Sequence, residues 1–266
     1  MKIDIYRMVL FAVGVGLGAP AWSADKFPCP QAPISLAFYE AGALYNEGKG
    51  LDVDVFEALR KRTGCTFQTS ERPRARIWME MEAGQLDMAT SAISTQAREQ
   101  FAHFVYYMRQ KNMVLAGKTL PTDIVSPEQF LANPALKWGA IRSYKHGVSY
   151  DAFVDQLRAS GRSPEAKDSP ELLRMLKLDM FAATLSIPLV YRYVLTDADL
   201  KAIRVMDWKK NEGDIPYALI FSRAKFSEPE IQRWREVVDD MTRDGTMLKL
   251  LSKYLPPVEA HAALLK

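Results

Sequence analysis

The chain is poor in the residues that carry most catalytic and metal chemistry. Its 266 residues include only two cysteines and three histidines. His103, His146 and His261 share no ligand spacing, so we expect no metal site. The sequence also lacks a Gly-x-Ser-x-Gly turn, a glycine-rich phosphate loop, and the His-Glu-x-x-His and Cys-x-x-Cys motifs. These absences predict a protein that is not an enzyme and needs no cofactor.

A strong charge of either sign is missing as well. The 35 basic and 32 acidic residues give a formal net charge of +3. The basic residues are scattered and form no stripe, so a nucleic-acid partner is not expected. A hydrophobic content of 48% is that of a globular protein, and the length allows one large domain or two smaller ones.

A long hydrophobic run is absent except for a short one near the amino terminus. Lys2 and Arg7 precede the uncharged run Val9–Gly18, and small residues follow as far as Ala24. This order is typical of a secretory signal peptide, and the run is too short to span a bilayer comfortably. We therefore expect residues 1–24 to be a signal peptide and the mature chain to be periplasmic. An uncleaved anchor is the alternative, and cleavage slightly before Ala24 fits about as well.

If the chain is exported, its two cysteines are expected to be oxidised. In an oxidising compartment an even number of cysteines favours a disulfide. A bridge between Cys29 and Cys65 closes a loop of about 36 residues, which in chain-entropy terms is worth roughly 3–4 kcal/mol. We expect this bridge to tie the segment before the first strand to the end of the first helix.

Short apolar runs alternate with segments of helical periodicity along the chain. The predicted strands are Ile34–Phe38, Cys65–Thr69, Leu86–Ser91, Trp138–Ile141, Leu178–Ala183 and Ile215–Ser222. The predicted helices are Leu51–Arg62, Arg74–Ala83, Val148–Arg158, Pro170–Lys177, Glu228–Arg243 and Thr246–Tyr254. Strands separated by helices predict right-handed crossovers and mostly parallel sheets with both faces covered. The tripeptide Leu-Asp-Met occurs near the end of each half of this pattern, at residues 86–88 and 178–180, which favours two α/β units.

The stretch Gly84–Tyr107 carries the chemistry that is readable from the sequence. A strand ends there in the small polar run Thr90–Thr95, and a short helix carrying Arg98 follows. Open parallel sheets bind ligands at the carboxyl ends of their strands. Hydroxyls and free backbone N–H groups at such an end hold a carboxylate, and an arginine grips it with two hydrogen bonds. The alternative is that Thr95 only caps the helix and Arg98 is a surface residue.

This stretch resembles the family 3 periplasmic solute-binding proteins, the polar amino acid-binding components of ABC importers. The residues that match the family's pattern are Gly84, Asp87, Ser91, Thr95, Arg98, Phe104 and Tyr107. The spacing from Thr95 to Arg98 is one residue shorter than in the family, although Ser94 restores it. The resemblance continues in segments Leu51–Gly64, Trp138–Gly147 and Met241–Tyr254, and so covers essentially the whole mature chain.

The resemblance implies a two-lobed periplasmic binding protein fold of type II. Each lobe is expected to be a mostly parallel sheet flanked by helices, and two strands form the hinge. Lobe one would comprise residues 25–111 plus 216–266, and lobe two residues 112–215. The implied function is capture of a small polar, carboxylate-bearing ligand, such as an amino acid, by hinge closure. The implied partner is an ABC permease in the inner membrane, and we expect a monomer.

The resemblance also implies ligand-binding residues in both lobes. Arg98 would bind a ligand carboxylate, with Ser91 contributing through its backbone or hydroxyl. In lobe two, Ser143 and Tyr144 follow a predicted strand at the place where the family presents backbone N–H groups to that carboxylate. Tyr39, just past the first strand, matches an aromatic residue that commonly covers the ligand. The alternative for Ser143 is a turn residue, and for Tyr144 a packing residue.

The sequence departs from the family in two places. Family members often hold an α-ammonium with an aspartate in lobe two, and the nearest polar position here is the neutral Thr184. Ile93 stands where a serine or threonine commonly helps to hold the ligand. A buried ammonium without a partner is costly, which argues against the standard α-amino acid mode. Arg74 and Arg76 begin the second helix, and we take Arg76 as a further ligand-binding residue.

Two other functions remain open at this level. The first is an enzyme on the same fold, such as a periplasmic dehydratase of the cyclohexadienyl type, with Glu40 as the nearest acid for the reaction. The second is a sensor or accessory binding protein that works without a permease.

Overall fold

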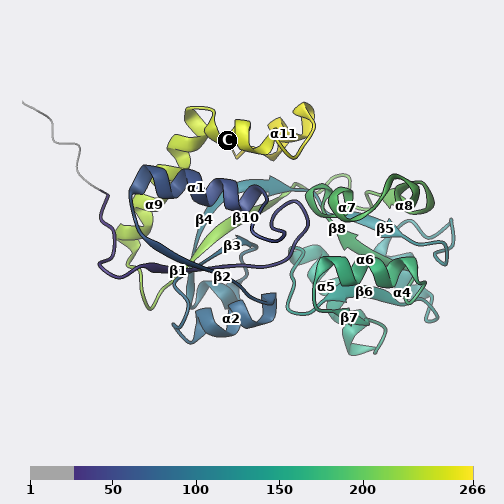
Figure 1. Cartoon of the computed structure of the whole chain (residues 1–266). Helices are drawn as coiled ribbons and strands as arrows, with labels where there is room; N and C mark the ends of the chain where they lie inside the picture. Colours follow the sequence, from purple (N-terminus) through teal and green to yellow (C-terminus); the bar gives the residue numbers. More distant parts are fainter. Residues whose placement is uncertain (1–26, 266) are drawn as a thin grey trace, which may run out of the picture.

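The computed structural model describes residues 27–265, which form two lobes placed side by side (Figure 1). The predicted signal peptide, residues 1–24, lies outside the described residues. Each lobe contains a five-stranded sheet with helices packed on it. The predicted two-lobed α/β fold is therefore confirmed.

Lobe one is built from both ends of the described chain. Its strand order is β2-β1-β3-β10-β4. The strands are β1 (Ile34–Phe38), β2 (Phe67–Glu71), β3 (Met88–Ala92), β4 (Ala102–Gln110) and β10 (Ile215–Ser222). The helices are α1 (Leu51–Thr63), α2 (Arg74–Glu82), α3 (Gln96–Glu99), α9 (Glu228–Arg243), α10 (Thr246–Leu251) and α11 (Pro257–Ala263).

Lobe two is formed by the middle of the chain, with the strand order β7-β6-β8-β5-β9. The strands are β5 (Met113–Ala116), β6 (Trp138–Ile141), β7 (Glu165–Ala166), β8 (Ala183–Ser186) and β9 (Arg204–Met206). The helices are α4 (Pro127–Ala132), α5 (Val148–Ala159), α6 (Ser169–Lys177), α7 (Pro188–Val194) and α8 (Asp197–Ala202).

Both sheets are mixed, and the reason lies in how the chain passes between the lobes. Strands β1, β2 and β3 pair in parallel, as do β6, β7 and β8. Strand β10, which returns to lobe one, runs antiparallel to β3 and β4, and β5, which enters lobe two, runs antiparallel to β8 and β9. The strands adjoining the crossings thus supply the antiparallel half of each sheet.

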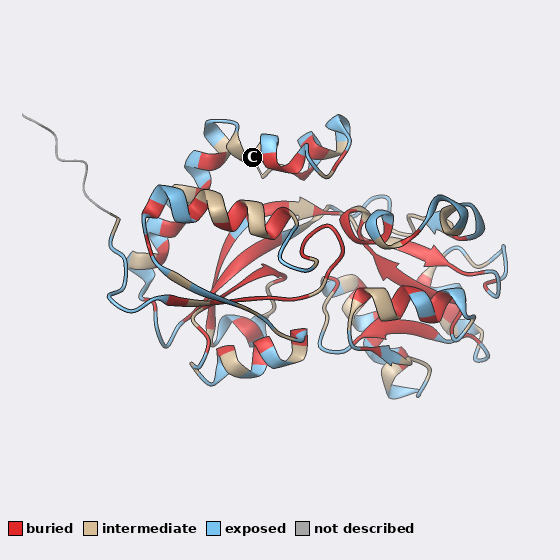
Figure 2. Cartoon of the chain, in the orientation of Figure 1, coloured by how far each residue is buried: buried red, intermediate tan, exposed pale blue. Residues whose placement is uncertain are grey.

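The strands carry the cores of the two lobes. All five residues of β3 are buried, and Figure 2 shows the strands buried between partly exposed helices. Helix α9 presents Ile231, Trp234, Val238 and Met241 to this core at helical spacing, while its other face is polar. A long amphipathic helix of this kind buries enough apolar surface to hold the carboxyl-terminal region on lobe one.

Three predicted strands were wrong in position, and one of them, Leu86–Ser91, is β3 and begins two residues later, at Met88. Strand β8 begins at Ala183, whereas the prediction ended there, because Leu178 caps α6 and Asp179 takes a left-handed conformation with φ of 55°. Strand β2 begins two residues later than predicted. Gly64 ends α1 in the left-handed conformation, so the chain needs residues 65–66 to turn into the sheet.

The structure contains the disulfide between Cys29 and Cys65, with a Cα–Cα distance of 5.3 Å. It joins the segment before β1 to the chain just after α1. The bridge closes a loop with a sequence separation of 36 residues. A cross-link over such a loop restricts the unfolded chain and leaves the folded lobe unchanged.

Replacing both cysteines by serine should lower the free energy of unfolding by about 3–4 kcal/mol, because the unfolded chain regains its loop entropy. Urea unfolding followed by tryptophan fluorescence measures this difference. A reductant should destabilise the wild-type protein by a similar amount and leave the double variant unaffected. Equal stability of the oxidised wild type and the double variant would contradict the prediction.

Candidate functional site

A cavity of about 250 Å³ lies between the two lobes. The cavity lies at the carboxyl ends of β1, β2 and β6, because its lining includes Tyr39, Glu71 and Ile141 at those ends. Open α/β sheets bind ligands at this edge. The volume lies just below the roughly 300–1,000 Å³ of typical small-molecule sites, which suits a small solute. Its lining residues are Tyr39, Glu40, Glu71, Arg72, Pro73, Arg74, Ile141, Tyr144, Lys167, Asp168 and Ser169.

Tyr39 and Arg74 form the buried wall of this cavity in lobe one. The guanidinium carbon of Arg74 lies 4.3 Å from the centre of the Tyr39 ring. Arg74 donates to the carbonyls of Thr90 and Ser91 at 3.2 Å each, and the Tyr39 hydroxyl donates to the Ser91 carbonyl at 3.1 Å. Burial raises the pKa of Tyr39 well above its usual value, so its hydroxyl keeps its proton.

Ser91 points its hydroxyl into the protein. It has a left-handed backbone conformation, with φ of 51°, at the end of β3. Its Oγ donates to Asp52 Oδ1 at 2.9 Å, and the Tyr107 hydroxyl donates to the same oxygen at 2.6 Å. The hydroxyl route that the sequence suggested for Ser91 is therefore occupied by Asp52. The residue shapes the cleft through its backbone, whose carbonyl holds Tyr39 and Arg74.

Arg98 connects the lobes. Its Nη1 donates to the carbonyl of Ile93 at 2.9 Å, and its Nη2 donates to the carbonyl of Ser143 in lobe two at 2.8 Å. The guanidinium carbon lies 3.8 Å from the centre of the Trp78 ring. Burial, followed by the positive charge of Arg74, lowers the pKa of Arg98 to about 9, so the group is still charged at neutral pH. Arg98 itself is not among the cavity-lining residues in this closed arrangement.

Ser143 and Tyr144 meet lobe one at the cavity. Ser143 has a left-handed conformation, with φ of 60°, in the turn after β6. Backbone strain of this kind persists where the surroundings fix it, which is common at ligand sites. Tyr144 lines the cavity, and the proximity of its hydroxyl contributes to the raised pKa of Tyr39. The structure thus brings together four of the predicted residues, which are Tyr39, Arg98, Ser143 and Tyr144.

Of the seven predicted ligand-binding residues, only Tyr39 and Tyr144 line the cavity; Ser91, Arg98 and Ser143 lie next to it, and Arg76 and Thr184 have other partners. Arg76 was a wrong choice, because its side chain is 65% exposed and pairs with Glu80 at 2.6 Å. Thr184 was also wrong, because its buried hydroxyl donates to the Gly139 carbonyl at 2.8 Å inside the sheet of lobe two. Strand β8 runs on to Ser186, so the polar residue at its carboxyl end is Ser186.

Sequence reasoning missed the pairing of Arg74 with Trp78. The two residues are four apart on α2 and therefore lie on one helix face, together with the buried Ile77 and Met81. The guanidinium carbon of Arg74 lies 4.8 Å from the centre of the Trp78 ring. The i, i+4 spacing to a tryptophan is the signal that separates Arg74, which faces inward, from Arg76, which faces solvent.

Carboxylates form another part of the cavity lining. Burial raises the pKa of Glu40, although Asn46 and the Gly42 N–H bind its two oxygens at 2.9 and 3.2 Å. The negative charges of Glu71 and Asp168 raise it further. Tyr39 has different electrostatic neighbours from Glu40, namely Tyr144, Arg74 and Asp52. The acidic side chains around Glu40 therefore form a part of the lining separate from Tyr39 and Arg74.

The lobes also touch beside the cavity. The Ala43 N–H donates to the carbonyl of Leu189 on α7 at 2.9 Å. Gly42 lies against the backbone of Val190, and a Cβ atom added to it would stand 2.9 Å from the Val190 Cα. On the far side of this contact, Arg192 of α7 forms an ion pair with Glu259 of α11 at 2.7 Å. The lobes are therefore in contact here and at the hydrogen bond from Arg98 to Ser143, and we call this arrangement closed.

Replacing Gly42 by alanine should keep the lobes from closing fully, because the new methyl group meets Val190. Gly48, in the same loop, also has a positive φ but has nothing within 4 Å of an added Cβ, so Gly48→Ala is the matched control. Both changes cost about 1 kcal/mol through the backbone conformation. Small-angle X-ray scattering should show a larger radius of gyration for Gly42→Ala alone. Identical radii for the two variants would show that closure does not use this contact.

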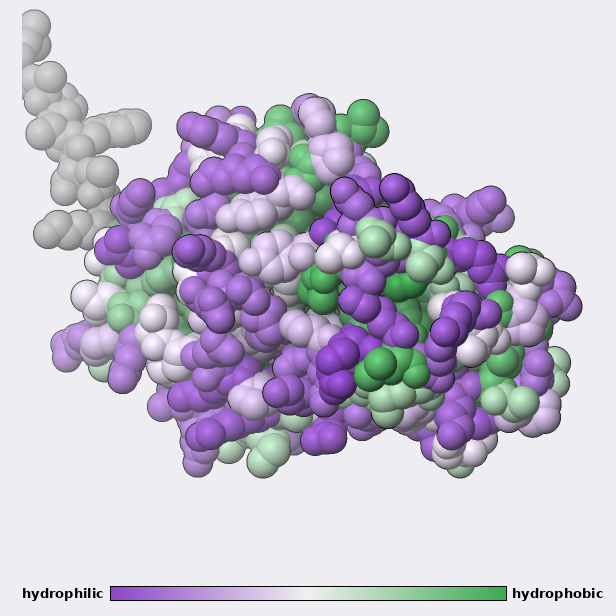
Figure 3. All heavy atoms as spheres, turned by 45° about the vertical axis from the view of Figure 1, so that its right-hand side comes forward, coloured by the Kyte–Doolittle hydropathy of each residue, from purple (hydrophilic) through white to green (hydrophobic). Residues whose placement is uncertain are grey.

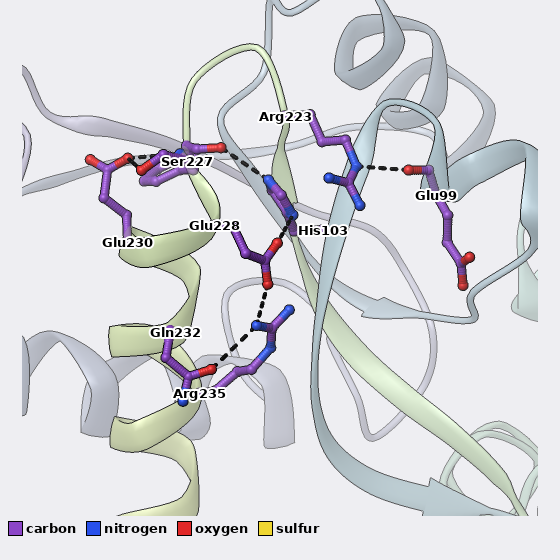
Figure 4. A network of polar contacts seen from close by, with 9 residues as sticks. Glu99, His103, Arg223, Ser227, Glu228, Glu230, Gln232 and Arg235 are labelled. Carbon is purple, nitrogen blue, oxygen red and sulfur yellow. Dashed lines mark hydrogen bonds and ion pairs between the residues drawn. The ribbon is translucent and has the colours of Figure 1, made fainter.

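A polar network at the start of α9 is structural (Figure 4). His103 of β4 is buried; its Nε2 lies 3.0 Å from the carbonyl of Phe226 and its Nδ1 lies 3.1 Å from Glu228 Oε2. Arg235, two turns along α9, holds the same carboxylate. These residues do not line the interlobe cavity, and they fix the beginning of α9 on lobe one.

Between residues 27 and 265, no three His, Cys, Asp or Glu side chains are grouped so as to hold a metal ion. None of the helices in that range combines the length and hydropathy needed to cross a bilayer.

The match to a family model agrees with this geometry. Residues 34–257 match the bacterial extracellular solute-binding proteins, family 3, so the chain belongs to this family. The resemblance drawn from the sequence motifs is thereby confirmed. No curated protein sequence is a significant match.

Solved structures with the same fold include both transport proteins and relatives with other roles. An arginine-, lysine- and histidine-binding protein from Geobacillus stearothermophilus has a TM-score of 0.69 at 16% identity, over 84% of this chain and 95% of its own. An ancestral amino acid-binding protein, a precursor of cyclohexadienyl dehydratase, has a TM-score of 0.67 at 18% identity, over 84% of this chain and 96% of its own. A histidine kinase sensor domain has a TM-score of 0.69 at 13% identity, over 88% of this chain and 98% of its own. At these identities the similarity establishes the fold alone.

Proposed function

We propose that this protein captures a small, carboxylate-bearing solute between its lobes and closes around it for ABC-type uptake. Residues 1–24 would direct the chain to the periplasm, and a permease in the inner membrane would receive the solute. The hinge would lie where the chain crosses between residues 25–111 and 112–215 and again before residues 216–266. The ligand would be bound without covalent chemistry or a cofactor.

The observation that carries this proposal is the position of Arg98. Its guanidinium is buried and bound to lobe two, and no carboxylate of the described residues lies within 4.0 Å of it. A buried charge without a counterion is costly, and a ligand carboxylate entering the cleft would supply one. A ligand that contacts both lobes binds the closed state better than the open one, and this difference in affinity drives closure.

The face of the molecule in Figure 3 supports a protein that works alone. Figure 3 shows a mainly hydrophilic face with small, separated hydrophobic patches. Stable obligate dimers bury large hydrophobic interfaces, of roughly 2,000 Å² or more, and this face offers no continuous patch of that kind. We therefore propose a monomer whose specific partners are the solute and the permease.

A thermal-shift screen tests the function. The purified mature chain is heated with amino acids, small carboxylates, phosphate esters and polyamines, each at millimolar concentration. Because a ligand that binds only the folded state stabilises it by mass action, a true ligand raises the melting temperature in proportion to the logarithm of its concentration. A carboxylate- or phosphate-bearing solute is expected to do so, and a screen without any such solute would reject the proposal.

An enzyme on this fold is the second candidate, because Glu40 lines the cavity and burial raises its pKa toward that of a usable acid. The similarity to a precursor of cyclohexadienyl dehydratase makes prephenate and arogenate the substrates to try. Turnover of either one that is lost in Glu40→Gln would replace the binding function. Saturable binding without turnover would leave the binding function in place.

A further inference from the structure

We propose that Arg74 and Arg98 form a paired-guanidinium site on the Trp78 ring, and that this pair makes the cleft selective for ligands with a compact, doubly charged anionic head. A phosphate monoester is the model for such a head. The inference rests on the proposed binding function and specifies its ligand chemistry.

The geometry places both guanidiniums on one aromatic ring. Their central carbons lie 4.8 Å (Arg74) and 3.8 Å (Arg98) from the centre of the Trp78 ring. Arg74 is 4% exposed and Arg98 is 9% exposed. A guanidinium stacked on an aromatic face keeps its N–H groups free in the plane of the stack, where they bind oxygen atoms. Trp78 thus holds two cationic groups in fixed orientations; Arg74 lines the cavity, and Trp78 and Arg98 lie directly behind it.

The two positive charges are not neutralised by close partners. Among the described residues no carboxylate oxygen lies within 4.0 Å of either guanidinium. The acids that act on them from a distance are Asp52 on Arg74 and Asp151 on Arg98. Both are already engaged, Asp52 with the hydroxyls of Ser91 and Tyr107 and Asp151 with a backbone N–H. The pair therefore favours a ligand that brings more than one negative charge.

Hydrogen-bond donors remain available around the pair. A guanidinium has five N–H groups, and Arg74 and Arg98 each use two of their terminal nitrogens on backbone carbonyls. Trp78 Nε1 is buried and has no hydrogen-bond partner in the described residues. A phosphate monoester has three terminal oxygens and a charge of about −1.5 to −2 at pH 7. It satisfies more of these donors than a carboxylate with two oxygens and one charge.

The acidic part of the lining limits where the second charge can be. Glu40, Glu71 and Asp168 line the same cavity, and the negative charges of Glu71 and Asp168 raise the pKa of Glu40. An extended dicarboxylate would place its second carboxylate beside these residues and be repelled. Both negative charges therefore belong to one head group at the arginine pair, and a positively charged tail is compatible with the acidic residues.

Two matched pairs of solutes test the selectivity by isothermal titration calorimetry at pH 7.5 and constant ionic strength. O-phosphoethanolamine is compared with 4-aminobutanoate, and ethyl phosphate with butanoate. Within each pair the tail is the same in charge and similar in length, and the head differs. The wild-type protein is expected to bind the phosphate member at least tenfold more tightly in both pairs, which corresponds to about 1.4 kcal/mol.

Variants on α2 locate the selectivity. Arg74→Gln should reduce the preference for phosphate to less than threefold, whereas the matched control Arg76→Gln, which is exposed on the same helix, should keep it. If circular dichroism shows that Arg74→Gln does not fold, Arg74→Lys is the second variant. It retains the charge but lacks the planar, two-pronged donor geometry of a guanidinium, so it should lower the preference for phosphate over carboxylate. Equal affinities within both pairs, a preference that survives in Arg74→Gln, or no binding by any of the four solutes would each overturn the inference. Binding of a different solute in the thermal-shift screen would then leave the binding function intact.

Discussion

Replacing Arg98 by alanine should weaken binding of the cleft ligand at least a hundredfold. The side chain supplies a buried positive charge and two charge-assisted hydrogen-bonding nitrogens, each bond worth about 1.5–3 kcal/mol when a charged group takes part. Its Nη2 now binds the Ser143 carbonyl of lobe two, so the change also removes a hydrogen bond between the lobes. Calorimetric titration with the solute that gives the largest thermal shift measures the effect.

The controls separate loss of the site from loss of the fold. Arg98→Ala also removes the stacking on Trp78, so its folding has to be checked by circular dichroism at the titration temperature. Arg76→Ala removes an arginine that is exposed on α2, and it should bind like the wild type. An Arg98→Ala protein that is folded and binds the solute with unchanged affinity would remove Arg98 from the site.

Acid should destabilise the protein through His146. This side chain is buried and its Nδ1 has no hydrogen-bond partner in the described residues. Burial, followed by the positive charges of Arg158 and Lys145, lowers its pKa from 6.5 to about 3. Above pH 6.5 the folded and unfolded states both hold a neutral ring, and this group adds no pH dependence. Between pH 6.5 and 3 only the unfolded chain takes up the proton, so stability falls by about 1.4 kcal/mol per pH unit.

The His146→Phe variant isolates that contribution. At pH 5 the wild-type free energy of unfolding should be lower than at pH 7.5 by about 2 kcal/mol more than that of the variant. Urea unfolding at both pH values gives this difference. Burial raises the pKa of Asp52, which contributes in the opposite direction, but that contribution is the same in the wild type and the variant and cancels. His261→Ala, at an exposed position of α11, is the matched control and should behave like the wild type. Parallel pH profiles for wild type and His146→Phe would show that His146 does not titrate as its burial requires.

Much of the fold was readable from the sequence, because the periodicity of apolar residues is local. The strands Ile34–Phe38, Trp138–Ile141 and Ile215–Ser222 and the helix Glu228–Arg243 were predicted with their observed ends. The prediction failed at Leu178–Ala183, where the repeated tripeptide suggested a strand and a left-handed residue instead ends α6. Short elements such as β7 and β9 carry too few residues for a pattern.

The site was less predictable, because its contacts join lobes that are distant in the chain. Tyr39, Arg98, Ser143 and Tyr144 were predicted from strand ends and family motifs. Tyr39 and Tyr144 line the cavity, and Arg98 and Ser143 are joined by a hydrogen bond between the lobes. Arg74 and Arg76 both lie at the start of α2, and nothing in the sequence analysis separated Arg76, which was chosen, from Arg74. Their orientations differ by the helical rotation, and only packing of α2 on lobe one decides which of the two is buried. Ser91 was expected to contribute through its backbone or its hydroxyl, because nothing local shows that Asp52 accepts the hydroxyl hydrogen bond.

The central claim is that the two lobes close on a small anionic ligand held at Arg98. Small-angle X-ray scattering of the mature chain, with and without a saturating concentration of the solute found by the thermal-shift screen, tests it most directly. The account predicts that the solute reduces the radius of gyration of the wild type to the value calculated for the closed arrangement in Figure 1, and leaves Arg98→Ala unchanged. A wild-type radius that stays the same while the solute binds, or one that shrinks equally in Arg98→Ala, would contradict it.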